Sequence, residues 1–231
     1  NHLEAATQTE NIAAKILTTL AQPYPIGTLH YEGTSSIGIT LLSESENSAE
    51  NLMKQADIAM YQAKNASRNT LRFFDPEMQA KIDARSVLEK HLRRALEKKE
   101  FELYYQIQVN NLNYPIGAEA LIRWHSPELG MVSPADFIPL AEETGLILPI
   151  GNWVLETACA QLSQWKDDSL LQNLTLAINV STVQFRQASF ETQVKATVER
   201  HAINPKRLKL EITESMLLNN IETAISAMNF L

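Results

Sequence analysis

The chain has 231 residues, 45% of them hydrophobic, and its 20 lysines and arginines face 27 aspartates and glutamates, for a formal net charge of −7. This composition indicates a globular chain with an ample core, either one large domain or a domain plus a fragment of another. The acidic balance disfavours binding to a nucleic-acid polymer, although metal ions or a few arginines could still neutralise a small phosphorylated ligand locally.

The first part of the chain carries both helix and strand signals. Apolar residues at helical spacing predict a helix over residues 10–22, and a second helix over residues 48–64 has Ser48 as its cap. Residues 29–42 between them contain two extended runs. We expect an α+β segment here.

A long amphipathic helix is predicted to connect this segment to the rest of the chain. Spaced apolar residues lie among many charges from Met78 to Leu96, and Asp75 and Pro76 suit the start of a helix. A domain boundary therefore falls near residue 80. The three predicted parts are residues 1–77, the connecting helix 78–99 and residues 100–231.

From Phe101 onward, strand, loop and helix signals repeat. The predicted strands are residues 101–109, 116–124, 174–181 and 207–215. The predicted helices are residues 133–143, 151–165, 188–202 and 219–231. Strands that alternate with helices of this length predict a parallel sheet or an α/β barrel, and four strands are too few to close a barrel. We therefore expect a truncated barrel, in a chain that is cut at both ends.

The single cysteine, Cys159, lies on the apolar face of the helix predicted over residues 151–165. A buried, unreactive thiol is the expected outcome for such a position, and no disulfide can form within the chain. The sequence has neither a signal peptide nor an apolar run of about 18 residues, so we expect a cytoplasmic location and no membrane contact within this segment. The chain opens on Asn1 without a methionine, which leaves room for an upstream sensor or membrane segment.

Three polar residues recur near the later half of successive predicted strands: Glu119, Asn179 and Glu211. That end of the strands is where active sites assemble in an α/β barrel. Oxygen donors from adjacent strands would form a divalent-cation site, and an all-oxygen set favours Mg²⁺ or Mn²⁺ over zinc. A lone glutamate in a strand is more often a surface residue than a ligand, so on spacing alone the two alternatives remain equal.

Arg123 lies on the same predicted strand face as Glu119. Its guanidinium has the fork geometry that binds phosphate, but a salt bridge to Glu119 or Glu211 accounts for it equally well. The histidines do not pair at metal-ligand spacings and are expected at the surface or at an interface: His91, His125 and His201. The sequence contains neither a glycine-rich phosphate loop nor a nucleophile elbow, which excludes P-loop NTPases and serine-type hydrolases.

These motifs resemble the EAL family of cyclic di-GMP phosphodiesterases. The resemblance covers residues 85–231 and rests on motifs in the family's order and spacing: "FELYYQIQV", "GAEALIRW", "SPADFIPLAEETGLILPIGNWVLETAC", "INVSTVQF" and "LKLEITES". Upstream, residues 1–77 resemble the closing third of a GGDEF domain in "SIGITLL", "ADIAMYQAKNASRN" and "RFFDPEM". This part lacks the GGDEF signature loop and metal-binding aspartate, so we expect no cyclase activity.

The resemblance implies a TIM-like (β/α) barrel of the EAL type, truncated and preceded by the α+β GGDEF remnant. It implies hydrolysis of one phosphodiester bond of cyclic di-GMP to linear pGpG by a metal-activated water. The site residues that it implies are Glu119, Asn179 and Glu211 as ligands of Mg²⁺ or Mn²⁺, Gln106 and Arg123 as contacts of the dinucleotide, Leu121 packed beside it, and Glu214 as support of a catalytic loop.

The sequence departs from the family in two ways. Ile107 replaces the proline that usually follows Gln106. The family's paired aspartates, lysine base and later loop glutamate all lie past the equivalent of Leu231, so we expect the chain alone to be inactive and the intact protein to be the enzyme. The alternative is a non-catalytic cyclic di-GMP receptor or scaffold. In either case, we expect a homodimer formed through the EAL part.

Overall fold

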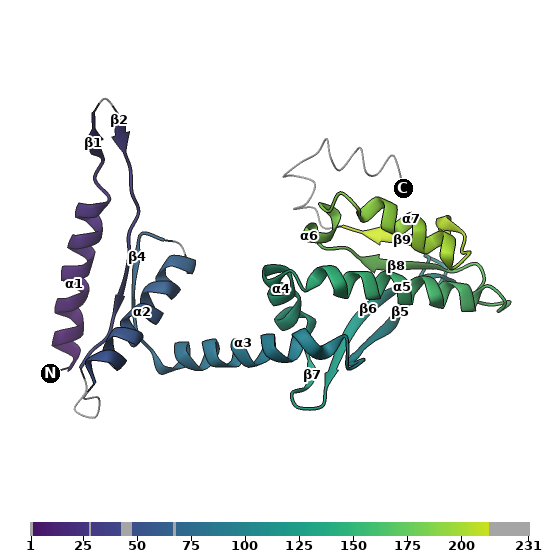
Figure 1. Ribbon diagram of the computed structural model, residues 1–231, viewed down its shortest axis with the longest axis horizontal. Helices are drawn as coiled ribbons and strands as arrows, with labels where there is room; N and C mark the ends of the chain where they lie inside the picture. Colours follow the sequence, from purple (N-terminus) through teal and green to yellow (C-terminus); the bar gives the residue numbers. More distant parts are fainter. Residues whose placement is uncertain (1, 28, 43–47, 67, 213–231) are drawn as a thin grey trace. The chain divides into compact units, whose positions relative to one another are not determined.

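The computed structural model describes residues 2–27, 29–42, 48–66 and 68–212, and it divides the chain into two compact units between Val87 and Leu88. The division falls inside helix α3 (Pro76–Ala95), which was predicted to connect two parts (Figure 1). The Asp75 side chain accepts a hydrogen bond from the Glu77 backbone amide, as expected at the start of a helix. The limits of the connecting helix that were predicted at residues 77 and 99 are not tested by this division and remain predictions.

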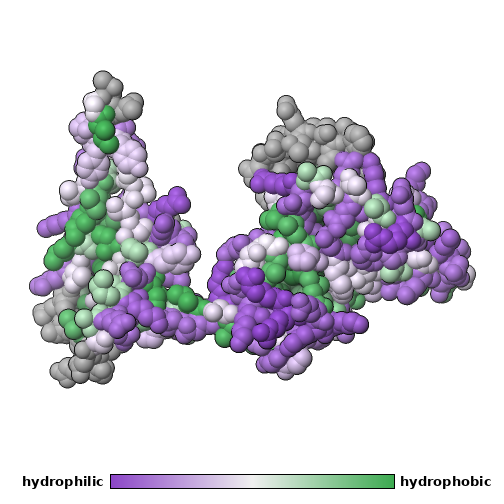
Figure 2. Space-filling view, viewed as in Figure 1, coloured by the Kyte–Doolittle hydropathy of each residue, from purple (hydrophilic) through white to green (hydrophobic). Residues whose placement is uncertain are grey.

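The first unit is an α+β arrangement, as predicted. Its elements are α1 (His2–Leu20), β1 (Tyr24–Ile26), β2 (Leu29–Tyr31), β3 (Ser36–Ile39), α2 (Ala49–Ala66) and β4 (Thr70–Phe73). β1 and β2 form an antiparallel pair, and β3 pairs with β4 in parallel. Sequence patterns missed β4, because four residues are too few to display a period. Apolar side chains remain exposed along α1, including Ile12 and Ile16 (Figure 2).

The second unit is built on a five-stranded sheet. Its strands are β5 (Phe101–Val109), β6 (Pro115–Ser126), β7 (Gly130–Val132), β8 (Thr175–Asn179) and β9 (Leu208–Glu211). They follow the order β5-β6-β8-β9, with the short β7 paired to β6. β6, β8 and β9 are parallel, as predicted. β5 runs antiparallel to β6, because residues 110–114 form a tight turn, whereas a parallel connection needs about a dozen residues or more.

Helices follow the strands in the predicted order. They are α4 (Pro134–Thr144), α5 (Ile147–Trp165), α6 (Thr182–Phe185), α7 (Phe190–Arg200) and the 3₁₀ turn η1 (Pro205–Arg207). Ser133 caps α4 by accepting from the Ala135 amide, as predicted. The helix predicted over residues 219–231 lies outside the described residues. Among the helices that the structure describes, none is long and apolar enough to cross a membrane.

The core of the second unit lies between the sheet and its helices. Trp124 of β6 is fully buried, and its ring meets the Phe137 ring edge-on with the centroids 5.5 Å apart. The Trp124 indole donates to the buried Glu100 carboxylate at 2.9 Å, so neither polar group lacks a partner. Cys159 of α5 is fully buried too, and this burial, with the nearby Glu156 charge, raises the pKa of its thiol to about 12. The predicted burial of Cys159 is confirmed.

A capping box after β8 fixes the chain that follows Asn179. The Ser181 hydroxyl accepts from the Gln184 amide, and the Gln184 side chain accepts from the Ser181 amide. Gln184 is buried against Gly151 of α5, where any Cβ would overlap the Gln184 amide group. The prediction started α5 at this glycine, whereas the helix begins at Ile147 and uses Gly151 for this close approach.

We expect Gly151→Ala to destabilise the protein by about 1–3 kcal/mol, because the new methyl displaces Gln184 from the capping box. Inside a helix, Gly→Ala usually increases the free energy of unfolding, so a decrease here would be the opposite of the usual effect. Ser181→Ala should cost about 1 kcal/mol by itself. Urea denaturation of both single variants and the double variant would measure these changes, and strictly additive effects would contradict the coupling between Gly151 and the cap.

Glu156 of α5 holds α7 through three side chains. It accepts from Thr197 at 2.9 Å and from Arg200, and its second oxygen lies 2.9 Å from Nε2 of His201. Burial raises the pKa of this carboxyl, but the hydrogen bonds from His201, Thr197 and Arg200 outweigh it and leave the pKa below its ordinary value. The ionised carboxylate therefore stabilises the fold.

A depressed pKa gives stability that is present above the unfolded value, about 4.3 for glutamate, and that is lost as the pH falls through the folded value. We expect Glu156→Gln to lower the unfolding free energy by about 0.5–1 kcal/mol at pH 7, since the cluster is partly exposed. The difference from the unmodified protein should shrink steadily below about pH 5. The comparison is Glu191→Gln, which removes an exposed i,i+4 pair with Lys195 on α7. A difference that is unchanged at pH 4 would refute the role of Glu156.

Candidate functional site on the open face of the sheet

Four of the seven predicted site residues lie on the strand pair β5 and β6, on the sheet face that the helices do not cover. In β6, the residues Glu119, Leu121 and Arg123 alternate with the buried residues of the opposite face, such as Ala120 and Trp124. Gln106 of β5 is the ladder partner of Glu119, so the two side chains project from the same face. Gln106 is exposed, and Glu119, Leu121 and Arg123 are half-buried.

The three candidate metal ligands stand on adjacent parallel strands. Glu119 is in register with Ala177 of β8, which places Asn179 two residues further along the same face. Asn179 is the ladder partner of Glu211, and these two residues end β8 and β9. The Asn179 amide nitrogen donates to the Glu119 carboxylate at 2.7 Å, across 60 residues of sequence. The structure therefore brings Asn179 to Glu119 and puts Glu211 on the neighbouring strand end.

Glu119, Asn179 and Glu211 form a row across the three strands, and the donor atoms of this row suit a hard divalent cation. Two carboxylates and an amide supply only oxygen ligands when the Asn179 amide turns its oxygen toward Glu119. Within the described ranges, no cluster of three or more histidine, cysteine, aspartate or glutamate side chains forms a metal site, since the third member here is an asparagine. Glu214, the seventh predicted site residue, lies outside the described residues.

Arg123 is held by its own strand and by a neighbouring ring. Its Nη1 donates to the Ile122 carbonyl oxygen at 2.8 Å, and its Cζ lies 5.5 Å from the centroid of the Tyr104 ring. In the part of the chain that the structure describes, Arg123 makes no ion pair with Glu119 or Glu211, so the salt-bridge alternative is not the arrangement found. Four residues along the strand separate Arg123 from Glu119, a span of roughly 13 Å.

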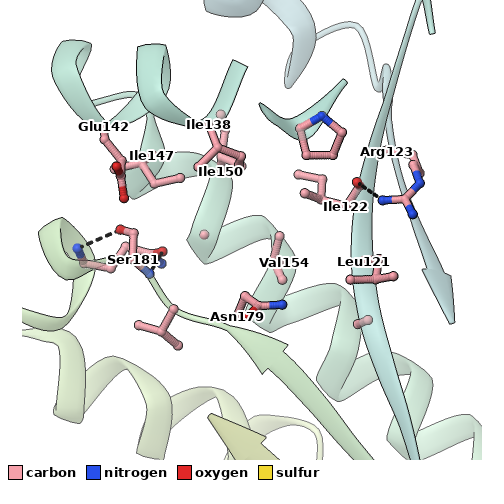
Figure 3. Close-up of a pocket in the computed structure, with 15 residues that line it drawn as sticks. Leu121, Ile122, Arg123, Ile138, Glu142, Ile147, Ile150, Val154, Asn179 and Ser181 are labelled. Carbon is pink, nitrogen blue, oxygen red and sulfur yellow. Dashed lines mark hydrogen bonds between the residues drawn. The ribbon is translucent and has the colours of Figure 1, made fainter. Parts of the chain in front are cut away.

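An apolar pocket of about 290 Å³ lies behind the site, between β6 and helices α4 to α6. Figure 3 shows Ile138, Ile147, Ile150 and Val154 around this pocket, while Arg123 extends from the other side of β6. Glu142 and Ser181 are the polar side chains at one end of it. Leu121, Arg123 and Asn179 also belong to the lining of this pocket, so the pocket borders the candidate site residues along β6 and the end of β8.

Sequence reasoning missed the side chains that support this row. The Ser181 and Gln184 capping box was visible as an S-x-x-Q pattern directly after Asn179. The contact of Tyr104 with Arg123 had no sequence signal, because it depends on the register between β5 and β6, in which Tyr104 pairs with Leu121. Of the three histidines, His201 lies on Glu156 and His125 lies beside Tyr104 on the open face.

Comparisons with known proteins extend these observations. Residues 89–231 match the family model of the EAL domain, and residues 1–70 match that of the diguanylate cyclase GGDEF domain. The chain is 39% identical over 215 residues to the bifunctional diguanylate cyclase/cyclic di-GMP phosphodiesterase MucR of Pseudomonas aeruginosa, covering 93% of this chain and 31% of MucR. It is 36% identical over 217 residues to the cyclic di-GMP phosphodiesterase PdeR of Escherichia coli, covering 94% of this chain and 32% of PdeR. The chain thus spans about a third of the length of these relatives.

Solved structures give the same assignment. The PaMucR phosphodiesterase in its c-di-GMP complex aligns with a TM-score of 0.57 and 40% identity, over 62% of this chain and 57% of that chain. The EAL enzyme Bd1971, in the form bound to cAMP and cyclic-di-GMP, aligns with a TM-score of 0.61 and 29% identity, over 80% of this chain and 48% of that chain. These neighbours confirm the predicted fold class, a partial EAL-type barrel after a GGDEF segment. Residues 1–70 are similar to a diguanylate cyclase GGDEF domain, and the chain belongs to the EAL domain family.

Proposed function

We propose that this chain carries one part of the active site of a metal-dependent cyclic di-GMP phosphodiesterase, and that it acts within a longer protein. The observation that carries the proposal is the row of Glu119, Asn179 and Glu211 on three adjacent parallel strands, with Gln106 and Arg123 on the same face. Two relatives that align over more than nine-tenths of this chain bear the name cyclic di-GMP phosphodiesterase, which supports the same activity here.

The proposed roles follow from the chemistry of each side chain. Glu119, Asn179 and Glu211 would hold Mg²⁺ or Mn²⁺, which would supply Lewis acidity and lower the pKa of a bound water. Gln106 offers an amide to the dinucleotide beside Glu119, and Leu121 packs against it. Arg123 donates to a phosphate at the far end of the row. Glu214 supports a catalytic loop. The product is linear pGpG.

The acidic charge of the chain makes the cation necessary. Glu119 and Glu211 would repel the phosphates of cyclic di-GMP, and the chain carries a net charge of −7. Glu119 and Glu211 would hold a divalent cation that offsets their negative charge, and Arg123 supplies a positive charge further along β6. We further propose that the protein forms a homodimer through its EAL part. We also propose a cytoplasmic location, since the proposed substrate is a small nucleotide.

We expect the full-length protein that contains this chain to convert cyclic di-GMP to pGpG in Mg²⁺ or Mn²⁺ and to lose activity in EDTA. Glu119→Gln and Asn179→Ala should each lower kcat by on the order of 100-fold or more, because each removes a ligand or its partner. Glu199→Gln, at an exposed position on α7, is the control and should leave kcat unchanged. Separation of the nucleotides by liquid chromatography gives the rates. Unmodified protein that leaves cyclic di-GMP uncut with both metals would refute the proposal. Binding without cleavage would favour the receptor alternative.

We expect the 231-residue chain by itself to show no catalytic turnover. It aligns with 57% of the PaMucR phosphodiesterase chain, and the strands that the structure describes are too few to close a barrel of eight strands. The same chromatographic assay, run at equal concentrations of the short chain and the full-length protein, would measure this. Comparable rates from the two would contradict the prediction.

A further inference from the structure

We propose that Tyr104 is a positioning residue that holds the Arg123 guanidinium open toward an anionic group of the substrate. This inference rests on the proposed function for the identity of the substrate, but the contact itself does not. Tyr104 lies on β5, on the same sheet face as Gln106. Its ladder partner is Leu121, so the ring reaches Arg123 along a diagonal of the sheet.

The first support is the geometry around the guanidinium. Its Cζ lies 5.5 Å from the Tyr104 ring centroid, within the range at which the ring face attracts a cation. Nη1 donates to the Ile122 carbonyl oxygen at 2.8 Å, as drawn in Figure 3. A guanidinium has five N–H donors, so these two contacts fix its plane and still leave most donors for a ligand.

The second support is that the Glu102 carboxylate contacts His125 and not Arg123. Glu102 is the ladder partner of Arg123 and would be the natural ion-pair partner across the strands. Its carboxylate instead lies 3.6 Å from Nε2 of His125, and no ion pair joins it to Arg123 in the described part of the chain. Among the described residues, Arg123 thus contacts a ring face and a carbonyl oxygen but forms no ion pair, so its positive charge is available to an anionic ligand.

The third support is the way the ring is held. The Tyr104 hydroxyl lies 3.4 Å from Nε2 of His125, and the two rings are 6.1 Å apart with a 34° tilt between them. His125 follows Arg123 by two residues on the same face, and its backbone amide donates to the Glu100 carbonyl oxygen at 2.9 Å. Because Tyr104 pairs with Leu121, Arg123 and His125 both lie toward the same end of β6 from Tyr104, and the His125 ring packs beside the Tyr104 ring there.

This arrangement predicts a separable contribution to binding. A side chain that only orients Arg123 affects substrate and transition state alike, so its loss raises KM and leaves kcat nearly unchanged. The contribution comes from the ring face, so phenylalanine should replace tyrosine, whereas leucine should not. A side chain that merely maintained the fold would lower the unfolding temperature and would not distinguish these two replacements by KM.

The test compares Tyr104→Phe, Tyr104→Leu, Arg123→Ala and Tyr104→Leu/Arg123→Ala in the full-length protein with cyclic di-GMP. We expect Tyr104→Leu to raise KM about fivefold and Tyr104→Phe to change it by less than about twofold, in keeping with one partly exposed cation–π contact. In the Arg123→Ala background, Tyr104→Leu should have no further effect on KM. Tyr114→Leu is the matched control, because Tyr114 is an exposed tyrosine beyond the end of β5.

A second readout does not depend on catalysis. The ring current of Tyr104 should shift the side-chain NMR signals of Arg123 upfield in the unmodified chain and in Tyr104→Phe, and Tyr104→Leu should abolish this shift. The proposal is overturned by an unchanged KM in Tyr104→Leu, by an equal loss in the Arg123→Ala background, or by absence of the shift. Protein that shows the shift but neither binds nor cleaves cyclic di-GMP would refute the proposed function and leave the Tyr104 contact supported.

Discussion

The candidate site depends on the register of the parallel ladder that joins β6, β8 and β9. The side-chain period of a strand is two, so a slip of one residue would turn Asn179 from the open face to the helix-covered face. Leu176 and Ile178 prevent this slip, because both are buried on the helix side of β8. Gly117 adds a close approach to its ladder partner Thr175 that a side chain would block. The hydrogen bond between Asn179 and Glu119 is thus a consequence of core packing on the opposite face.

The two faces of β6 carry different parts of the free energy. Ala118, Ala120 and Trp124 lie in the core, and the Trp124 indole is anchored by the Glu100 carboxylate. The alternate residues Glu119, Leu121 and Arg123 are half-buried and do not belong to the buried core. This separation explains how one strand can contain a carboxylate and a guanidinium without burying either charge. The stability of the strand comes from one face, and the proposed chemistry comes from the other.

Much of the second unit could be predicted from the sequence, because its strands and helices are long enough to display their periods. β5 was predicted at its observed bounds, and Ser133 was identified as the cap of α4. The short elements β1, β4, β7, α6 and η1 were missed, since three or four residues by themselves show no periodicity. The antiparallel orientation of β5 was not predicted, because the alternation of strands with helices indicates parallel pairing and the tight turn before β6 was not weighed. The face shared by Glu119 and Arg123 followed from the strand period, whereas the contacts of Tyr104 and His125 required the cross-strand register.

The separation of charges along the open face sets what this part of the protein can bind. Glu119, Asn179 and Glu211 form an anionic end that attracts a divalent cation, and Arg123 forms a cationic end roughly 13 Å away along β6. A ligand with one phosphate fits only one of these ends, whereas a cyclic dinucleotide presents two phosphates across a ring. Under the proposed function, a cation would be needed for the first phosphate to approach the carboxylates, whereas Arg123 would bind the second phosphate directly. Binding and hydrolysis are therefore expected to respond differently to metal, with Arg123 contributing affinity in its absence.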